Sequence, residues 1–292
     1  MRKALAEIIA GVIPCKMARN QWRGRLRYGL RRGARLRREI KQNASKPEHY
    51  LAICAIAKDE GPYFAEWLDW HISQGVDKFY VYDNGSTDCT RQVLAPYVEK
   101  GIVDLIDWPG HRMQIAAYDD CIERHRFDTR WLAFIDLDEF IVPLKDQSVT
   151  DFLRRMEDFS AVEINWLIYG SSGQKEKLPG TMMERFRRHS RPDHILNRHV
   201  KSIVDPRRVY CMIGCHEAAR ITGQAANEQG RPLKKSFRDR TPQQQVIRIN
   251  HYATRSLAEF AEKQARGRAS GRQKTVQSSY FDQYDLNDLP EE

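Results

Sequence analysis

Short apolar segments of strand length alternate with helical patterns in the first half of the chain, and this alternation most constrains the fold. Residues 50–57 form a continuous apolar run, as expected for a parallel strand that is buried on both faces. The pattern predicts further strands at residues 78–83, 102–106 and 131–136, with helices at 62–74, 88–95 and 111–125. Such an order predicts an α/β fold, a mostly parallel, Rossmann-like sheet flanked by helices.

Polar side chains follow three of these strands. Ligands of parallel α/β sheets bind beyond the carboxyl ends of the strands, so these side chains predict a single site at one edge. The candidate ligand-binding residues are Lys58, Glu60, Asp83, Asn84 and Asp136.

Asp136 and Asp138 are the strongest candidates for chemistry. Alternate residues of a strand point the same way, so both carboxylates should face one side while Leu137 turns into the core. Two close carboxylates repel each other unless a cation joins them. Oxygen ligands suit Mg²⁺ or Mn²⁺, and these ions suit a diphosphate. Asp83 is either part of an ordinary strand-to-helix turn or a nucleotide contact.

The second half of the chain predicts fewer elements. A fifth strand is expected at residues 161–169, a short strand at 246–249 and a last helix from Ser256 to about Arg266. We therefore predict a folded domain over residues 46–267 and a mobile tail over 268–292.

The basic character of the chain lies in its first 41 residues. The net charge is +9, but residues 1–41 contain 13 Lys and Arg against two acids, so they carry +11 and the rest carries −2. Apolar residues recur there at helical spacing, which predicts a basic amphipathic arm and linker over residues 1–45, separate from the domain. We favour contact with an anionic membrane surface over a solvated arm or a helix on a partner. Nucleic acid is unlikely as the partner because the remaining chain has no matching basic stripe.

The cysteines and the N-terminal sequence predict a cytoplasmic protein at the inner face of the membrane. Six cysteines are scattered along the chain, which is typical of reduced thiols. Cys211, Cys215 and His216 are better explained by buried strand thiols than by a zinc site. No apolar run reaches the roughly 18 residues that span a bilayer. Glu7 and Pro14 interrupt the first apolar run, which argues against an export signal.

The motifs occur in an order that resembles the GT-A-fold glycosyltransferases, most closely family 92 and the related branch of family 2. The similarity covers about residues 50–267. The motifs that carry it are Ala57-Lys-Asp-Glu-Gly61, Glu66-Trp-Leu-Asp-Trp-His71, Tyr82-Asp-Asn-Gly-Ser-Thr-Asp88, Phe134-Ile-Asp-Leu-Asp-Glu-Phe140, Lys201-Ser-Ile-Val204 and Asn250-His-Tyr252 followed by Lys263.

This resemblance implies transfer of a sugar from a nucleotide-diphosphate sugar to a saccharide acceptor, with a metal ion and with inversion. It implies that Asp83 contacts the nucleotide, that Asp136 lies near the ribose and the metal, and that Asp138 holds the metal. His251 would complete the metal shell, with His216 as the alternative.

Inversion requires a carboxylate base, and Glu184 is the candidate that the resemblance offers. The competing interpretation of Glu184 is a salt bridge to a neighbouring arginine. The start of the arm resembles some bacterial surface-polysaccharide glycosyltransferases, which implies a lipid-linked acceptor.

Three other functions compete with this one. A nucleotidyltransferase would carry a glycine-rich loop with a basic residue after the first strand, and Lys58-Asp-Glu-Gly61 does not supply it. A nucleic-acid-binding protein would act through the basic arm. A scaffold without catalysis is disfavoured by the intact pair of Asp136 and Asp138.

Overall fold

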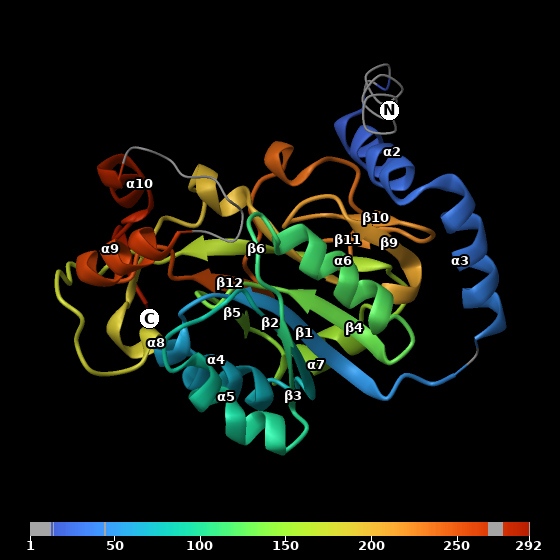
Figure 1. Cartoon of the computed structure of the whole chain (residues 1–292). Coiled ribbons are helices and arrows are strands. Elements are labelled where there is room, and N and C mark those ends of the chain that lie inside the picture. Colours follow the sequence, from blue (N-terminus) through green and yellow to red (C-terminus); the bar gives the residue numbers. More distant parts are fainter. Residues whose placement is uncertain (1–12, 14, 44, 268–276, 292) are drawn as a thin grey trace.

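Nine strands of the described residues form a mixed central sheet (Figure 1). The computed structural model describes residues 13, 15–43, 45–267 and 277–291. The strand order is β3-β2-β1-β4-β8-β6-β12-β5, and β11 pairs with β6 beside this path. The parallel half consists of β1 (His49–Ala57), β2 (Lys78–Asp83), β3 (Val103–Asp107) and β4 (Thr129–Phe134). The predicted α/β fold with a mostly parallel sheet is therefore confirmed.

Helices cover both faces of this half, as the apolar run at residues 50–57 predicts. Ile53 and Ala55 of β1 belong to the same core as α4 (Gly61–Ser73), whereas Cys54 and Ile56 pack with α6 (Gln114–Arg124). The helix α5 (Thr90–Glu99) lies beside α4 and continues through Pro96, where the sequence predicts its end.

Beyond β4 the sheet changes direction, which the sequence pattern does not predict. β8 (Val200–Val204) is antiparallel to both β4 and β6 (Ala161–Ile168), and β12 (Ile247–His251) is parallel to β6. β5 (Glu139–Pro143) forms the edge beside β12. The smaller elements are α7 (Val149–Arg154), α8 (Met182–Arg185), β9 (Val209–Met212), β10 (Ala218–Arg220) and β11 (Ala225–Ala226). Three short 3-10 helices lie at Ile195–Arg198, Pro206–Arg208 and Phe237–Asp239.

Side chains of α4 satisfy the open edge of β5. Trp67 Nε1 donates to the Glu139 carbonyl at 3.0 Å, and Trp70 Nε1 donates to the Ile141 carbonyl at 3.1 Å. The Nε2 atom of His71 accepts from the Ile141 N–H at 3.3 Å. Burial lowers the pKa of His71 to about 3, so its imidazole is neutral at neutral pH. The helix therefore supplies the hydrogen bonds that a further strand would otherwise make.

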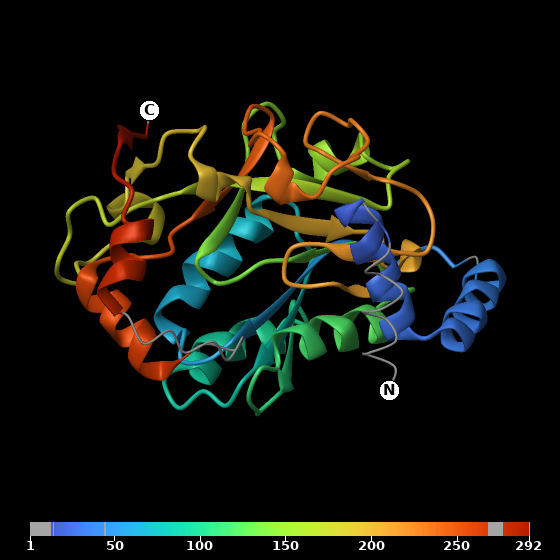
Figure 2. The same cartoon turned by 90° about the horizontal axis from the view of Figure 1, so that it is seen from above.

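The basic arm is helical, as predicted, but it is docked on the domain. The helices α2 (Lys16–Tyr28) and α3 (Leu30–Gln42) lie on the β9–β10 hairpin, at the opposite end of the molecule from α9 and α10 (Figures 1 and 2). Gln21 donates to the Ala218 carbonyl at 2.9 Å and accepts from the Arg220 N–H at 2.8 Å. The described residues of the arm predicted over 1–45 are therefore packed on the domain, and residues 1–12, 14 and 44 lie outside the described part.

The described helices include none that is long and apolar enough to cross a bilayer.

Of the tail predicted over residues 268–292, residues 277–291 are packed on the domain, whereas residues 268–276 and 292 lie outside the described part. After α9 (Leu257–Arg266), the helix α10 (Gln277–Tyr284) packs beside α9, and β13 (Leu289–Pro290) pairs with β7 (Arg188–His189). Asp285 and Asn287 accept hydrogen bonds from the N–H groups of Ser171 and Ser172, at 2.5 and 2.8 Å. A polar sequence is ordered here because its side chains satisfy a loop of the domain.

We predict that Gly24→Leu detaches the arm. A Cβ atom at Gly24 would lie 2.3 Å from the Cβ atom of Ala219, and such overpacking costs about 1–3 kcal/mol. Leucine favours helix over glycine, so any loss reflects the contact and not the helix. Limited trypsin digestion followed by mass spectrometry should show faster cleavage within α2.

Arg35→Leu is the matched control, because it introduces leucine on the exposed face of α3. The side chain of Arg35 is 74% exposed. Equal cleavage of the wild type and Gly24→Leu would contradict the packing of α2 on β10.

Candidate active site

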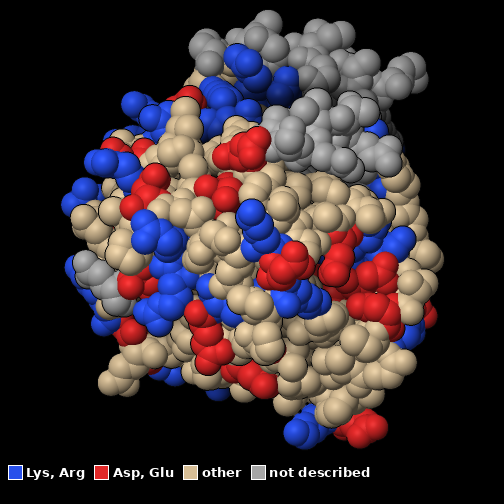
Figure 3. All heavy atoms as spheres, turned by 90° about the vertical axis from the view of Figure 1, so that its left-hand side faces the viewer, with Lys and Arg blue, Asp and Glu red and all other residues tan. Residues whose placement is uncertain are grey.

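The carboxyl ends of β1, β2 and β4 meet at one edge of the sheet. Ala57 pairs with Asp83 at the ends of β1 and β2, and the turn that contains Asp136 and Asp138 follows β4. Lys263 of α9 reaches this turn, so the edge belongs to the end of the molecule that carries α9. Basic and acidic side chains are interspersed on the surface of that end (Figure 3). The predicted clustering of polar residues at one edge is thus seen.

Asp83 and Asn84 are buried and build the turn that follows β2. Asp83 accepts from the Ser86 N–H at 2.8 Å and pairs with Arg91 at 2.7 Å. The side-chain amide of Asn84 donates to the carbonyls of Trp108 and Gly110, at 2.7 and 3.1 Å. The structure therefore gives both residues a role in shaping the edge, and a nucleotide contact through Asp83 stays a prediction.

Glu60 is engaged by arginines of the C-terminal region. Its carboxylate accepts from Arg255 at 3.0 Å and pairs with Arg266. Arg255 is buried, and its φ of 56° lies in a region that non-glycine residues seldom adopt. Lys58 is exposed, and no contact of its side chain is recorded among the described residues. Glu60 thus anchors the segment before α9, which differs from the predicted ligand contact.

Asp136 is held by donors from two other elements. Its Oδ2 atom lies 2.7 Å from Nζ of Lys201, and its Oδ1 atom accepts from Gln114 at 3.0 Å and from the Tyr118 hydroxyl at 3.3 Å. Lys201 also lies 3.1 Å from Oε2 of Glu139, and its side chain is 1% exposed. Burial raises the pKa of Glu139, while Lys201 acts in the opposite direction. Both oxygen atoms of Asp136 therefore have protein partners.

Asp138 is buried and faces a second lysine. Its Oδ2 atom accepts a hydrogen bond from Nζ of Lys263, which also donates to the Ala253 carbonyl at 3.1 Å. The Nε2 atom of His251 lies 3.6 Å from the same oxygen. Burial alone would raise the pKa of Asp138, but the Lys263 ammonium holds it well below its ordinary value. Asp138 is therefore an ionised carboxylate whose Oδ2 atom faces both a cation and an imidazole.

His251 has the state that a metal ligand needs. Burial lowers its pKa, so the imidazole is neutral at neutral pH, and neutral imidazole is the form that binds metals. Its ring centroid lies 4.2 Å from that of Trp166. For His216, by contrast, the described contacts are an Nδ1–H that donates to the Val200 carbonyl at 2.7 Å and a ring that packs on Phe237, and none of them is to Asp138. The geometry therefore favours His251 over His216 beside Asp138.

The predicted set of three metal ligands is not assembled. Within the described ranges, no three or more His, Cys, Asp and Glu side chains converge where one ion could bind. Lys201, Gln114 and Tyr118 engage Asp136, which leaves Asp138 and His251 as a pair. Carboxylate and neutral imidazole together fit a divalent ion whose remaining ligands come from a diphosphate or water.

Glu184 is engaged as a helix cap. It belongs to a capping box at the start of α8, where its carboxylate accepts from the Thr181 N–H at 3.0 Å and from the Thr181 hydroxyl at 2.8 Å. These bonds lower its pKa, and the group is exposed to solvent. The structure thus shows a helix cap where a salt bridge was the competing interpretation, and the role of Glu184 as a base stays a prediction.

The sequence contains a signal that points to Lys201. Lys201 is the one charged residue of the buried strand β8, and a lysine is almost never fully buried unless it is paired. Its presence therefore indicates a buried carboxylate partner. Lys263 gives no comparable signal, because lysines are common on the surfaces of helices.

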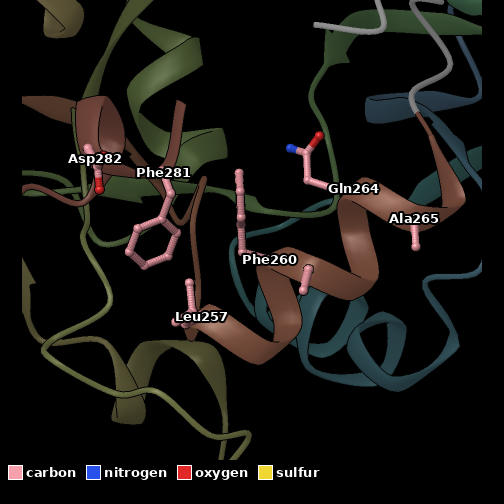
Figure 4. A pocket seen from close by; sticks show the side chains of 7 residues that line it. Leu257, Phe260, Gln264, Ala265, Phe281 and Asp282 are labelled. Carbon is pink, nitrogen blue, oxygen red and sulfur yellow. The ribbon is translucent and has the colours of Figure 1, made fainter. Parts of the chain in front are cut away.

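An apolar hollow of about 320 Å³ lies between α9 and α10 (Figure 4). None of the candidate site residues lines this hollow, so we do not assign it to the site. It is lined by Leu257, Phe260, Ala261, Gln264, Ala265, Phe281 and Asp282.

A sequence profile of glycosyltransferase family 92 matches residues 49–283. A family 92 protein of Oryza sativa subsp. japonica is 31% identical over 107 residues, which are 36% of this chain and 18% of that protein. The galactan β-1,4-galactosyltransferase GALS3 of Arabidopsis thaliana is 31% identical over 110 residues, 34% of this chain and 22% of that protein. The matched stretch thus spans less than a quarter of either relative.

Two solved structures are distantly similar. Residues 1–349 of TarS from S. aureus are 14% identical with a TM-score of 0.36, over 54% of this chain and 47% of that chain. The mannosyltransferase PcManGT from Pyrobaculum calidifontis, in complex with GDP-Man and Mn²⁺, is 18% identical with a TM-score of 0.31, over 56% and 47%.

We predict that Lys201→Met destabilises the protein strongly. Methionine would leave the carboxylates of Asp136 and Glu139 without their cation, and removing one partner of a buried pair costs about 3–5 kcal/mol. Chemical denaturation monitored by circular dichroism measures this loss.

Lys78→Met is the control, because Lys78 pairs with Asp104 at 2.7 Å where the aspartate side chain is 46% exposed. A pair whose carboxylate is half exposed to water should contribute about 1 kcal/mol or less. Similar losses in the two variants would refute the special importance of Lys201.

Proposed function

Because the chain belongs to glycosyltransferase family 92, we propose that it transfers a sugar from a nucleotide-diphosphate sugar to a saccharide acceptor. The observation that carries this proposal is the position of Asp136, Asp138 and His251 at the carboxyl edge of the sheet, where α/β folds bind ligands. Family membership supports the reaction class, and the residues at this edge support the donor site.

We assign the nucleoside of the donor to the part of this edge that contains Asp83, Asn84 and Asp136. Asp83 and Asn84 hold the turn after β2, and the buried Lys201 fixes the orientation of the Asp136 carboxylate. Carboxylates fixed in this way are suited to accept hydrogen bonds from ribose hydroxyls, because their own positions are set before the ligand arrives.

A divalent ion, Mn²⁺ or Mg²⁺, fits Asp138 and His251. These residues offer one carboxylate and one neutral imidazole whose facing atoms lie 3.6 Å apart. Such an ion would neutralise the charge of the leaving diphosphate. Asp136 is not included among the ligands, because Lys201 and two other donors already engage its oxygen atoms.

The acceptor is proposed to be a saccharide, in keeping with the relatives that are named galactan β-1,4-galactosyltransferases. Galactose donors are therefore the first to test. A lipid-linked saccharide fits the membrane contact that is proposed below. Inversion at the anomeric carbon is proposed as well, and the configuration of the product by NMR tests it.

We predict that Asp138→Asn abolishes metal-dependent donor binding and leaves the fold intact. Asparagine preserves the shape of the side chain but removes the charge that attracts a cation. Hydrogen bonds and contacts that involve a charged group are stronger than those between neutral groups. We therefore expect the donor affinity to fall by at least about tenfold. Calorimetry with UDP-sugars and GDP-sugars, with Mn²⁺ and with chelator, measures it.

Asp104→Asn is the control for this experiment, because Asp104 belongs to a half-exposed ion pair with Lys78. Donor affinity that is the same in Mn²⁺ and in chelator, for both the wild type and Asp138→Asn, would remove the metal from the proposal. Failure of every nucleotide-sugar to bind the wild type would refute the proposed function itself.

We further propose that the outward face of α3 contacts an anionic membrane. The protein would then act in the cytoplasm, at the inner face of that membrane. One face of α3 packs on Tyr210 through Gly33 and Leu36. The exposed residues Arg31, Arg35 and Arg38 lie on the other face. Docking of the helix thus leaves a basic strip available to phospholipid head groups.

We predict that the triple variant Arg31→Gln, Arg35→Gln, Arg38→Gln loses binding to anionic vesicles. Each basic residue near such a surface contributes about 1 kcal/mol, so the loss should approach about a hundredfold. Sedimentation with phosphatidylcholine vesicles that contain phosphatidylglycerol, at low and high salt, measures it.

The control replaces three arginines outside the arm by glutamine, namely Arg154, Arg155 and Arg191, and it should bind vesicles like the wild type. If the wild-type protein does not bind anionic vesicles but binds RNA tightly, the membrane proposal is wrong and nucleic acid is the partner of the arm.

A further inference from the structure

Two lysines neutralise the acidic turn in different ways. Lys201 comes from the middle of the sheet, is 1% exposed and lies within 3.1 Å of two carboxylates. Lys263 comes from α9, is 18% exposed and bonds one carboxylate, that of Asp138, together with the Ala253 carbonyl. Lys201 is therefore a permanent part of the core, whereas Lys263 can be exchanged at lower cost, since its charge can return to water.

Lys263 occupies the place that a metal ion needs. Its ammonium is bonded to Oδ2 of Asp138, and this oxygen is also the one that His251 Nε2 faces at 3.6 Å. A divalent ion bound between Asp138 and His251 would lie next to the ammonium, and like charges at this range repel strongly in a buried site. The ammonium and the ion therefore compete for one oxygen.

We propose that Lys263 is a resident cation that holds Asp138 in the donor-free protein and moves to the donor diphosphate when metal and donor bind together. The inference rests on the proposed function, because it needs a diphosphate beside Asp138. Lysine suits this exchange, since it carries a point charge on a flexible stem of four carbons and binds phosphate readily.

The charges explain why metal and donor should enter together. Asp138 and Lys263 form a neutral pair in the free protein. A divalent ion alone would add positive charge beside the ammonium, whereas an ion together with the anionic diphosphate leaves the site balanced. Lys263 therefore weakens the binding of metal alone and strengthens the binding of metal with donor.

The test removes the ammonium by Lys263→Met and measures two affinities. Electron paramagnetic resonance of free Mn²⁺ gives the affinity for Mn²⁺ alone, which should rise about tenfold because the competing cation is gone. Calorimetry with UDP and with GDP in saturating Mn²⁺ should show an affinity that falls about tenfold, because the diphosphate loses a partner.

Two variants control for charge and for folding. Lys263→Arg keeps a cation and should bind Mn²⁺ alone like the wild type. Lys177→Met removes a lysine whose side chain is 40% exposed and lies 3.9 Å from Glu262 of α9, and it should leave both affinities unchanged. Circular dichroism establishes that each variant is folded.

The proposal is overturned if Lys263→Met binds Mn²⁺ alone no more tightly than the wild type does. So would equal changes in Lys263→Met and Lys177→Met. If the wild type binds neither nucleoside diphosphate nor nucleotide-sugar, the proposed function fails and the transfer of Lys263 to a diphosphate fails with it. The titration with Mn²⁺ alone is independent of that result and still decides whether Lys263 competes for Asp138.

Discussion

The turn between β4 and β5 gathers three carboxylates, the buried Asp138 and Glu139 and the partly exposed Asp136, and two lysines from later parts of the chain neutralise them. Carboxylates that leave water without a partner are strongly destabilising. The partners are Lys201 and Lys263, which come from β8 and α9. The reversal of strand direction at β8 places Lys201 next to the turn, and the packing of α9 beside this edge places Lys263 there. The later half of the chain is thus arranged around the charges of the earlier half.

The motif at residues 66–71 positions the acids without touching them. Trp67, Trp70 and His71 bind the backbone of β5, the strand that begins at Glu139 directly after the acidic turn. Because β5 lies at the edge of the sheet, its outer backbone groups need partners, and α4 provides them. A substitution in this motif is therefore expected to act through the placement of β5. The motif at residues 66–71 therefore has a structural role in this chain.

Local patterns in the sequence were enough to predict the parallel half of the fold and the resemblance to family 92, which the match to residues 49–283 confirms. They also placed Asp136 and Asp138 at the end of a buried strand, because strand length and apolar runs are properties of neighbouring residues. The pairing of these acids could not be predicted, because the charge of Lys201 within β8 signals a buried carboxylate partner but does not specify which one, and Lys263 gives no such signal. Glu184 is a different case: Thr181 stands three residues before it, so the capping box is present in the sequence itself. The resemblance directed attention to a base and away from this simpler local explanation.

The helix α6 joins the basic arm to the acidic turn. Near its start, Gln114 and Tyr118 donate to Asp136, and the next residue, Asp119, pairs with Arg27 of α2 at 2.8 Å. An α-helix moves as a stiff unit, so the docking of α2 at Asp119 and the orientation of Asp136 depend on the position of a single element. The sequence divides the chain into a basic arm and a neutral domain, but the contacts do not follow this division. The arm that is proposed to meet the membrane is held by the same helix that holds the first acid of the site, and both therefore belong to one packed unit.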